Sequence, residues 1–246
     1  MIEKREIVFI LGAGASEVYG LPSSSALIEA AQSDRSEALR LALQTHLHQD
    51  VDRDLVRFQE MIEKAKPFSI DRFLETQPEA DRIIGKALIS HALLKCQTMD
   101  RLYGRRGDAR DYVDRYYDND WMRWLLEYMK ADILEEFLVN KVRFITFNYD
   151  QSLDTLLTNA LLARYRHVGI EDAKRRIQDR IVHVYAQIGT CAYERTDDLQ
   201  HDHRIAEAIR RGIERIQIIS EGDDVSRVRE FQIAHRWLRT PNTMAR

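Results

Sequence analysis

The feature that most constrains the fold is a short apolar segment that ends directly in glycines. Residues Ile7–Leu11 form a continuous apolar run rich in β-branched side chains, and Gly12, Ala13 and Gly14 follow at once. Such a run is typical of a strand buried on both faces of a parallel sheet. Glycines let the chain turn sharply and let a phosphate approach the backbone N–H groups. We predict a strand, a phosphate-binding loop and a helix whose positive N-terminal end faces the phosphate; the alternative is an ordinary strand-to-helix turn.

Three further apolar runs resemble the first, at Val142–Phe147, Ile181–Tyr185 and Ile216–Ile219. Apolar residues spaced i, i+3, i+4 predict helices after the second run and around the others. These helices are expected over Gln151–Leu162, Glu171–Arg180, Arg204–Arg215 and Val225–Leu238. The alternation of strands and helices predicts a parallel α/β sheet.

The first two runs are separated by about 130 residues, far more than a normal crossover connection needs. This interval predicts helices over Ser24–His46, Leu55–Lys66, Glu79–Cys96 and Trp121–Leu138, with a polar loop at Arg101–Asp120. The predicted fold class is therefore α/β, a Rossmann-like three-layer parallel sheet with a large helical insertion. Residues 1–28 and 140–246 would form the sheet domain, and residues 29–139 the inserted helical module.

Composition excludes several classes of protein. The 246 residues include 37 Lys and Arg against 40 Asp and Glu, a net charge of −3, which gives no argument for a nucleic-acid partner. No window has the ~18 uncharged apolar residues of a membrane span, and the N-terminus lacks a secretory pattern. The two cysteines, Cys96 and Cys191, cannot build a four-cysteine zinc site. We expect a cytoplasmic protein with no zinc or other metal.

Polar residues follow the second apolar run, where Asn148 and Asp150 stand two positions apart. Ligands of open α/β sheets bind beyond the carboxyl ends of the strands, and residues two apart on extended backbone share a side. An Asn amide can bind a ribose or hold a water, and an Asp can accept hydrogen bonds from ribose hydroxyls or stabilise positive charge. The alternative for Asp150 is that it caps the helix that begins at Gln151.

Together the two motifs resemble the signatures of the sirtuin superfamily, G-A-G-x-S-x-x-x-G-[IL]-P and then T-x-N-x-D. The chain matches the first signature at Gly12, Ala13, Gly14, Ser16, Gly20, Leu21 and Pro22, and the second at Thr146, Asn148 and Asp150. It is most similar to the bacterial sirtuin-like domains that destroy NAD in antiphage defence, which carry a helical insertion between the motifs and lack a zinc ribbon. A dehydrogenase is disfavoured because Glu17 replaces the third glycine of its fingerprint.

The resemblance implies hydrolysis of NAD to nicotinamide and ADP-ribose rather than protein deacylation. NAD would be bound by Gly12, Ala13, Gly14, Ala15, Ser16, Gly20, Leu21, Pro22, Thr146, Asn148 and Asp150. Catalysis is expected from Asn148, at the water or ribose, and from Asp150, at the ribose or nicotinamide. Tyr185 stands where the family has a catalytic histidine, with His183 two residues before it, and which of the two acts stays open.

Three further expectations accompany this resemblance. The partners would be NAD and a second copy of the chain or another defence protein, with no nucleic acid and no membrane. The family's final strand is expected to be missing, because the chain ends at Arg246 after a polar segment. The altered histidine position and the missing strand favour one alternative, a module that binds NAD or ADP-ribose without turnover. Another alternative is a structural subunit of a defence complex. His183 itself could be a buried, satisfied core histidine.

Overall fold

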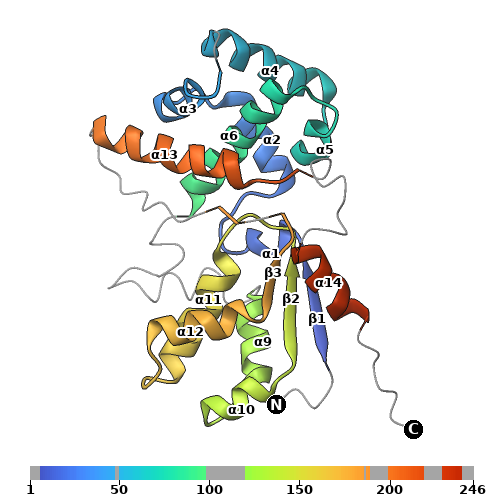
Figure 1. The fold of residues 1–246 in the computed structure, drawn as a ribbon, viewed down its shortest axis with the longest axis vertical. Helices are drawn as coiled ribbons and strands as arrows, with labels where there is room; N and C mark the ends of the chain where they lie inside the picture. The colour runs from blue at the N-terminus through green and yellow to red at the C-terminus, as the bar shows by residue number, and fades with distance from the viewer. Residues whose placement is uncertain are drawn as a thin grey trace.

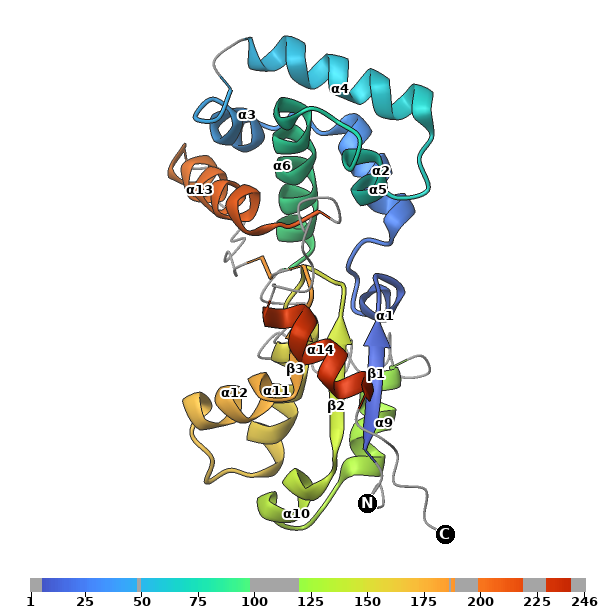
Figure 2. The ribbon, with the colours of Figure 1, turned by 45° about the vertical axis from the view of Figure 1, so that its right-hand side comes forward.

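The computed structural model describes residues 6–47, 50–97, 120–185, 187–188, 199–218 and 229–239. In this part of the chain the protein is mixed α/β and elongated, with a parallel sheet and its covering helices at one end and a group of helices at the other (Figures 1 and 2). Among the residues described, none of the helices combines the length and the apolar character that a membrane span requires.

The sheet consists of three parallel strands in the order β1-β2-β3. They are β1 (Ile7–Leu11), β2 (Val142–Thr146) and β3 (Ile181–His183). Three of the four predicted strands are thus confirmed, although β3 ends two residues earlier than its apolar run. The fourth prediction, Ile216–Ile219, is not a strand over 216–218, and residue 219 lies outside the described residues.

Helices cover both faces of this sheet. Alternate strand residues, such as Phe9 and Phe144, pack against one group of helices: α9 (Trp121–Met129), α10 (Leu134–Val139), α11 (Ser152–Arg164) and α12 (Ile170–Gln178). The intervening residues, such as Ile145 and Val182, pack against α14 (Arg229–Arg239) on the opposite face. The continuous apolar runs are explained by this burial on both sides. The predicted residues 225–228 of the last helix lie outside the described residues.

The second group of helices has its own core around α6 (Glu79–Cys96), which is buried without interruption from Ile84 to Leu94. Around it lie α2 (Ser24–Ser33), α3 (Glu37–Leu43), α4 (Val51–Ala65), α5 (Ile70–Leu74) and α13 (Leu199–Arg215). We call this group the helical lobe. α13 approaches α6 closely at Gly212, where an added Cβ would lie 2.7 Å from the Cβ of Ser90.

The packing does not follow the predicted division into residues 29–139 and the rest. Helices α9 and α10 fall inside that interval but pack on the sheet. Helix α13 falls outside it but packs in the helical lobe. Residues 101–119 of the predicted polar loop lie outside the described residues.

Two segments predicted as single helices are each divided. In Ser24–His46, α2 ends at Ser33 and α3 begins after Ser36, whose hydroxyl accepts a hydrogen bond from the Leu39 N–H. In Trp121–Leu138, α9 and α10 are separate helices. The first break is a capping effect, because Ser hydroxyls satisfy the free N–H groups of a new helix.

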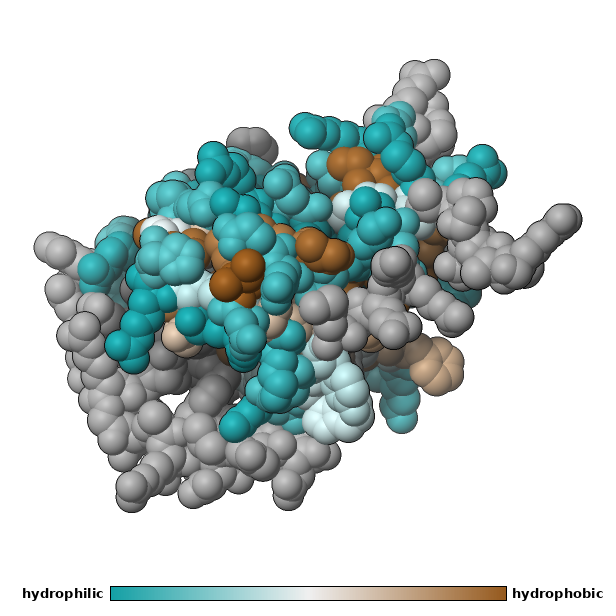
Figure 3. Space-filling view, turned by 90° about the horizontal axis from the view of Figure 1, so that it is seen from below, coloured by the Kyte–Doolittle hydropathy of each residue, from teal (hydrophilic) through white to brown (hydrophobic). Residues whose placement is uncertain are grey.

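The surface of the sheet end gives little indication of a partner. On the face seen in Figure 3, the described residues are mostly hydrophilic, and apolar side chains form small separate patches. Scattered apolar residues of this kind are ordinary on protein surfaces.

Candidate functional site

The two sequence motifs meet at the carboxyl ends of β1 and β2. Leu11 pairs with Thr146, so the loops that follow the two strands lie side by side. The Asn148 side chain joins them, since its Nδ2 donates to the Gly12 carbonyl at 3.0 Å and to the Ser16 hydroxyl at 2.9 Å. A carbonyl only accepts, so the Gly12 contact identifies the nitrogen of this amide. Its oxygen receives no hydrogen bond from the described residues and is available as an acceptor.

The glycine loop leads into a helix, as predicted, but this helix, α1 (Gly14–Glu17), is a single turn. Two of its amides are used within the loop, as the Ala15 N–H donates to the Gly12 carbonyl and the Ser16 N–H to the Ala13 carbonyl. At Gly12 and Gly14, the space that a Cβ would occupy is open to 4 Å. The loop therefore keeps an open side, but it does not present the N-terminus of a long helix.

The second half of the first signature connects the sheet to the helical lobe. Gly20 has φ 77°, a left-handed conformation that glycine adopts without strain. Leu21 is buried in the core of the helical lobe, and Pro22 precedes α2. The Ala15 carbonyl accepts a 2.8 Å hydrogen bond from the Trp121 indole of α9. These residues hold the glycine loop between the two cores.

Asp150 forms an Asx turn immediately before α11, whose N-cap residue is Gln151. Its Oδ1 accepts hydrogen bonds from the Ser152 N–H at 2.9 Å and from the Ser152 hydroxyl, at the start of α11. The same hydroxyl lies 3.2 Å from that of Ser16. The Thr146 hydroxyl accepts from the Asn148 N–H at 3.1 Å. Buried Thr146 and Asp150 thus fix the loop that carries Asn148, which supports the capping alternative for Asp150.

His183 faces the back of this loop. Its Nε2 lies 2.9 Å from Asp154 of α11, and its Nδ1 lies 3.2 Å from the Asn148 carbonyl. Burial opposes protonation of this ring, but the hydrogen bond and charge of Asp154 outweigh it, so the pKa of His183 lies above its ordinary value. The protonated ring donates from both nitrogens. His183 therefore supports the Asn148 loop from behind, and Asp154 is a partner that the sequence patterns did not indicate.

Tyr185 has a different environment, because β3 ends at His183 and the chain turns before Tyr185. Its ring packs against Phe147 at 5.6 Å and against Phe231 of α14 at 5.8 Å between centroids. Burial, and then the charge of Asp71, raises the pKa of Tyr185. The phenol therefore stays protonated at neutral pH and is a hydrogen-bond donor rather than a base.

A cavity of about 380 Å³ separates this edge of the sheet from the helical lobe. Its size is in the range of small-molecule sites. Five of its lining residues were predicted as site residues: Ala13, Pro22, Asn148, Asp150 and Tyr185. The helical lobe contributes Ser24, Leu27, Ser69, Asp71 and Leu93, and the Asn148 loop adds Phe147 and Tyr149. His183 is not among the lining residues.

Asp71 and Tyr149 form a polar contact across this cavity that sequence reasoning missed. The Tyr149 hydroxyl donates to Asp71 Oδ1 at 2.7 Å and lies 3.3 Å from the Gln217 carbonyl. Burial raises the pKa of Asp71, against the opposing effect of the Tyr149 hydrogen bond. No motif surrounds residue 71, so only the fold reveals that its carboxylate reaches the site.

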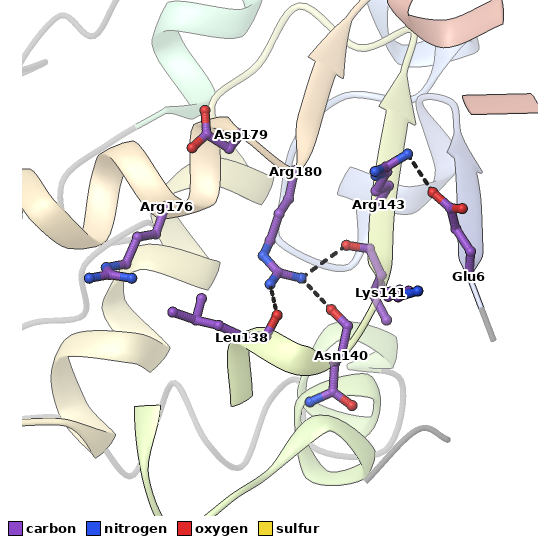
Figure 4. A pocket seen from close by; sticks show the side chains of 9 residues that line it. Glu6, Leu138, Asn140, Lys141, Arg143, Arg176, Asp179 and Arg180 are labelled. Atoms are coloured by element: carbon purple, nitrogen blue, oxygen red, sulfur yellow. Dashed lines mark hydrogen bonds and ion pairs between the residues drawn. The ribbon is translucent and has the colours of Figure 1, made fainter. Parts of the chain in front are cut away.

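A second cavity, of about 410 Å³, lies at the opposite, amino-terminal end of the strands (Figure 4). Its central side chain, Arg180, donates to three backbone carbonyls, those of Leu138, Asn140 and Val142. Burial, and then the charge of Arg143, lowers the pKa of Arg180. Arg143 itself is paired with Glu6. Arg180 and Arg143 are thus both bonded to protein groups. We interpret their role as structural, because Arg180 fixes the turn between α10 and β2.

Within the described ranges, no group of three or more His, Cys, Asp and Glu side chains is arranged to hold a metal ion. A comparison of the chain with protein families, with curated proteins and with solved structures finds no match.

Proposed function

We propose that this chain is a sirtuin-like NAD glycohydrolase, built on a Rossmann-like sheet, that cleaves NAD to nicotinamide and ADP-ribose. The observation that carries the proposal is the position of Asn148. Its amide nitrogen is fixed to both sides of the glycine loop, and its amide oxygen is available where the side chain lines the 380 Å³ cavity. A preorganised acceptor of this kind can hold a water or a ribose hydroxyl without rearrangement.

The chemistry requires positioning more than a strong nucleophile. The bond between nicotinamide nitrogen and ribose C1′ breaks, its electron pair neutralises the pyridinium ring, and C1′ passes through an oxocarbenium-like transition state. Water then forms the new bond to C1′ and loses a proton. In this scheme Asn148 orients the water or a ribose hydroxyl, and the protonated phenol of Tyr185 donates a hydrogen bond. His183 is a positioning residue, because it contacts the Asn148 carbonyl and not the cavity.

The likeness to defence-type domains extends the proposal to antiphage defence, with a second copy of the chain or another defence protein as partner. The open sides of Gly12 and Gly14 support a pyrophosphate position beside the loop. The single turn of α1 does not add the dipole of a long helix.

The test is chromatographic measurement of nicotinamide release from NAD by the wild-type chain, Asn148→Ala and Asn159→Ala. The Asn148→Ala variant should lose at least about 100-fold in rate, the size of effect found when one preorganised polar group is removed. Asn159→Ala is the control: it makes the same substitution within α11, at a residue that is not among those lining the cavity, and it should retain activity. Equal release by wild type and Asn148→Ala would contradict the proposal.

The orientation of His183 favours a second candidate, a module that binds NAD or ADP-ribose without turnover. Both ring nitrogens face protein groups, and the phenol of Tyr185 has a raised pKa. A thermal shift with NAD that is not accompanied by nicotinamide release would favour this candidate. The Asn148→Ala variant should then lose the shift as well.

A further inference from the structure

We propose that Asp71, contributed by the helical lobe, binds the positively charged nicotinamide end of oxidised NAD and thereby selects the oxidised over the reduced dinucleotide. This inference rests on the proposed function, because it assigns a substrate contact within the same cavity. It gives the helical lobe a direct part in substrate recognition.

The first argument is the geometry of the carboxylate. Asp71 lines the cavity together with Asn148, and Tyr149 connects the two. Tyr149 directly follows Asn148 in the chain, and its hydroxyl holds Asp71 Oδ1 at 2.7 Å. The tyrosine is buried, with 7% of its surface exposed, so this contact is shielded from water. The carboxylate and the Asn148 amide therefore line the same cavity, one from the helical lobe and one from the edge of the sheet.

The second argument is the charge of the cavity. Among the described residues that line it, the carboxylates are those of Asp71 and Asp150, and none is Lys, Arg or His. Asp150 is occupied by Ser152 at the start of α11. Within the described part of the chain, no cation lies at ion-pair distance from Asp71. A desolvated carboxylate without a counter-ion is unfavourable, and a cationic ligand would relieve that cost.

The third argument is the surrounding surface. Leu27, Leu93 and Phe147 line the same cavity. Leu27 and Leu93 are buried, and such apolar surface lowers the local dielectric and strengthens the attraction between a carboxylate and a cation. The raised pKa of Asp71 reports this desolvation. The cavity thus combines a carboxylate without a cationic partner with apolar contact area, which suits a flat aromatic cation.

Oxidised and reduced NAD differ in the relevant property. The nicotinamide ring carries a positive charge in the oxidised form and none in the reduced form, whereas the remaining parts of the two molecules are the same. During cleavage, positive charge moves from the ring to the adjacent C1′ and stays within reach of the same carboxylate. The contact would therefore also favour the transition state.

The experiment measures dissociation constants by calorimetry for two probes, carba-NAD and NADH. Carba-NAD retains the cationic ring, but a methylene replaces the ribose ring oxygen, so it is not cleaved. The wild-type chain should bind carba-NAD at least about tenfold more tightly than NADH. Asp71→Asn should remove this preference by weakening carba-NAD binding about tenfold, with NADH changed less than twofold. Asn keeps an oxygen that can accept from Tyr149.

The matched control is Asp52→Asn, the same change at an exposed carboxylate of α4 outside the cavity lining, which should keep the preference. If Asp71→Asn weakens the binding of carba-NAD and NADH equally, or changes neither, the inference about Asp71 is overturned. The proposed function is not affected by either result. Absence of binding of both probes to the wild-type chain would overturn the proposed function as well. If Asp71→Asn fails to fold, Tyr149→Phe is measured in its place. The preference for carba-NAD over NADH should then fall by about threefold, and an unchanged preference would overturn the inference.

Discussion

Replacing Gly212 by Ala tests the docking of α13 on α6, which builds the helical lobe from two distant parts of the chain. The added methyl would lie 2.1 Å from the Ser90 hydroxyl and 2.7 Å from the Ser90 Cβ. The hydroxyl can rotate away, but the Cβ cannot, and favourable carbon contacts begin at about 3.5 Å. The two helices must therefore separate by several tenths of an ångström. Such overpacking costs about 1–3 kcal/mol.

An opposing effect is the helix propensity of Ala, which exceeds that of Gly by about 1 kcal/mol. Because the 2.7 Å clash involves a Cβ that cannot rotate away, the upper part of the overpacking range applies, about 2–3 kcal/mol. We therefore expect Gly212→Ala to lower the free energy of unfolding by about 1–2 kcal/mol, as measured by urea denaturation followed by circular dichroism. The added Ser90→Gly change removes the clashing Cβ, so the double variant should be more stable than the sum of the two single effects predicts. Arg211→Ala, on the exposed side of α13, should change stability by less than about 0.5 kcal/mol.

The result also bears on the candidate site. Gln217 follows α13, and its N–H donates to the Tyr185 carbonyl at 3.3 Å while its carbonyl accepts from Tyr149. A displaced α13 should therefore weaken carba-NAD binding. A Gly212→Ala variant that is as stable as the wild-type chain would refute the close docking of α13 on α6.

Two further predictions concern buried ion pairs. The pKa of His183 is raised in the folded chain, so its pairing with Asp154 stabilises the fold. This stability is complete below about pH 6.5, the ordinary His pKa, and is lost as pH rises through the folded pKa. Asp154→Asn should therefore destabilise the chain in urea denaturation at pH 6 and much less at pH 9. Asp34 bonds to His91 at 2.6 Å and to Lys95 at 2.8 Å. Burial alone would raise the pKa of Asp34, but these two partners outweigh it and hold the pKa well below its ordinary value. Asp34→Asn should cost about 3–5 kcal/mol in thermal or urea unfolding at pH 7, and a change below 1 kcal/mol would contradict this assignment.

Local patterns predicted the elements whose signals are contained in a few residues. The run Ile7–Leu11 and its glycines predict a strand and a turn, and both are present. The meeting of Asn148 with Gly12 could also be anticipated, because parallel strands bring their carboxyl ends to one edge. In contrast, the break between α2 and α3 was missed although Ser36 is a strong capping residue.

Tertiary packing decided what the local patterns left open. The amphipathic pattern of Arg204–Arg215 predicts a helix, but it contains no information on whether that helix packs on the sheet or on α6. The same holds for Asp71, whose place in the cavity depends on how α5 packs against α2 and α6. His183 and Tyr185, the two candidates for the family's catalytic histidine, have different surroundings because β3 ends at His183. Tyr185 therefore lines the cavity and His183 does not.

The sheet register has a consequence for the order of folding. Strands β2 and β3 pair across about 40 residues, whereas β1 pairs with β2 across about 130 residues. Closing a longer loop is entropically more demanding, so the pairing of β1 is expected to follow that of β2 with β3. The glycine loop travels with β1, and Asn148 has no partner from Gly12 and Ser16 until β1 arrives. The site would thus be completed in the last step of folding, and a refolding chain would regain its sheet before it regained its ability to bind ligand.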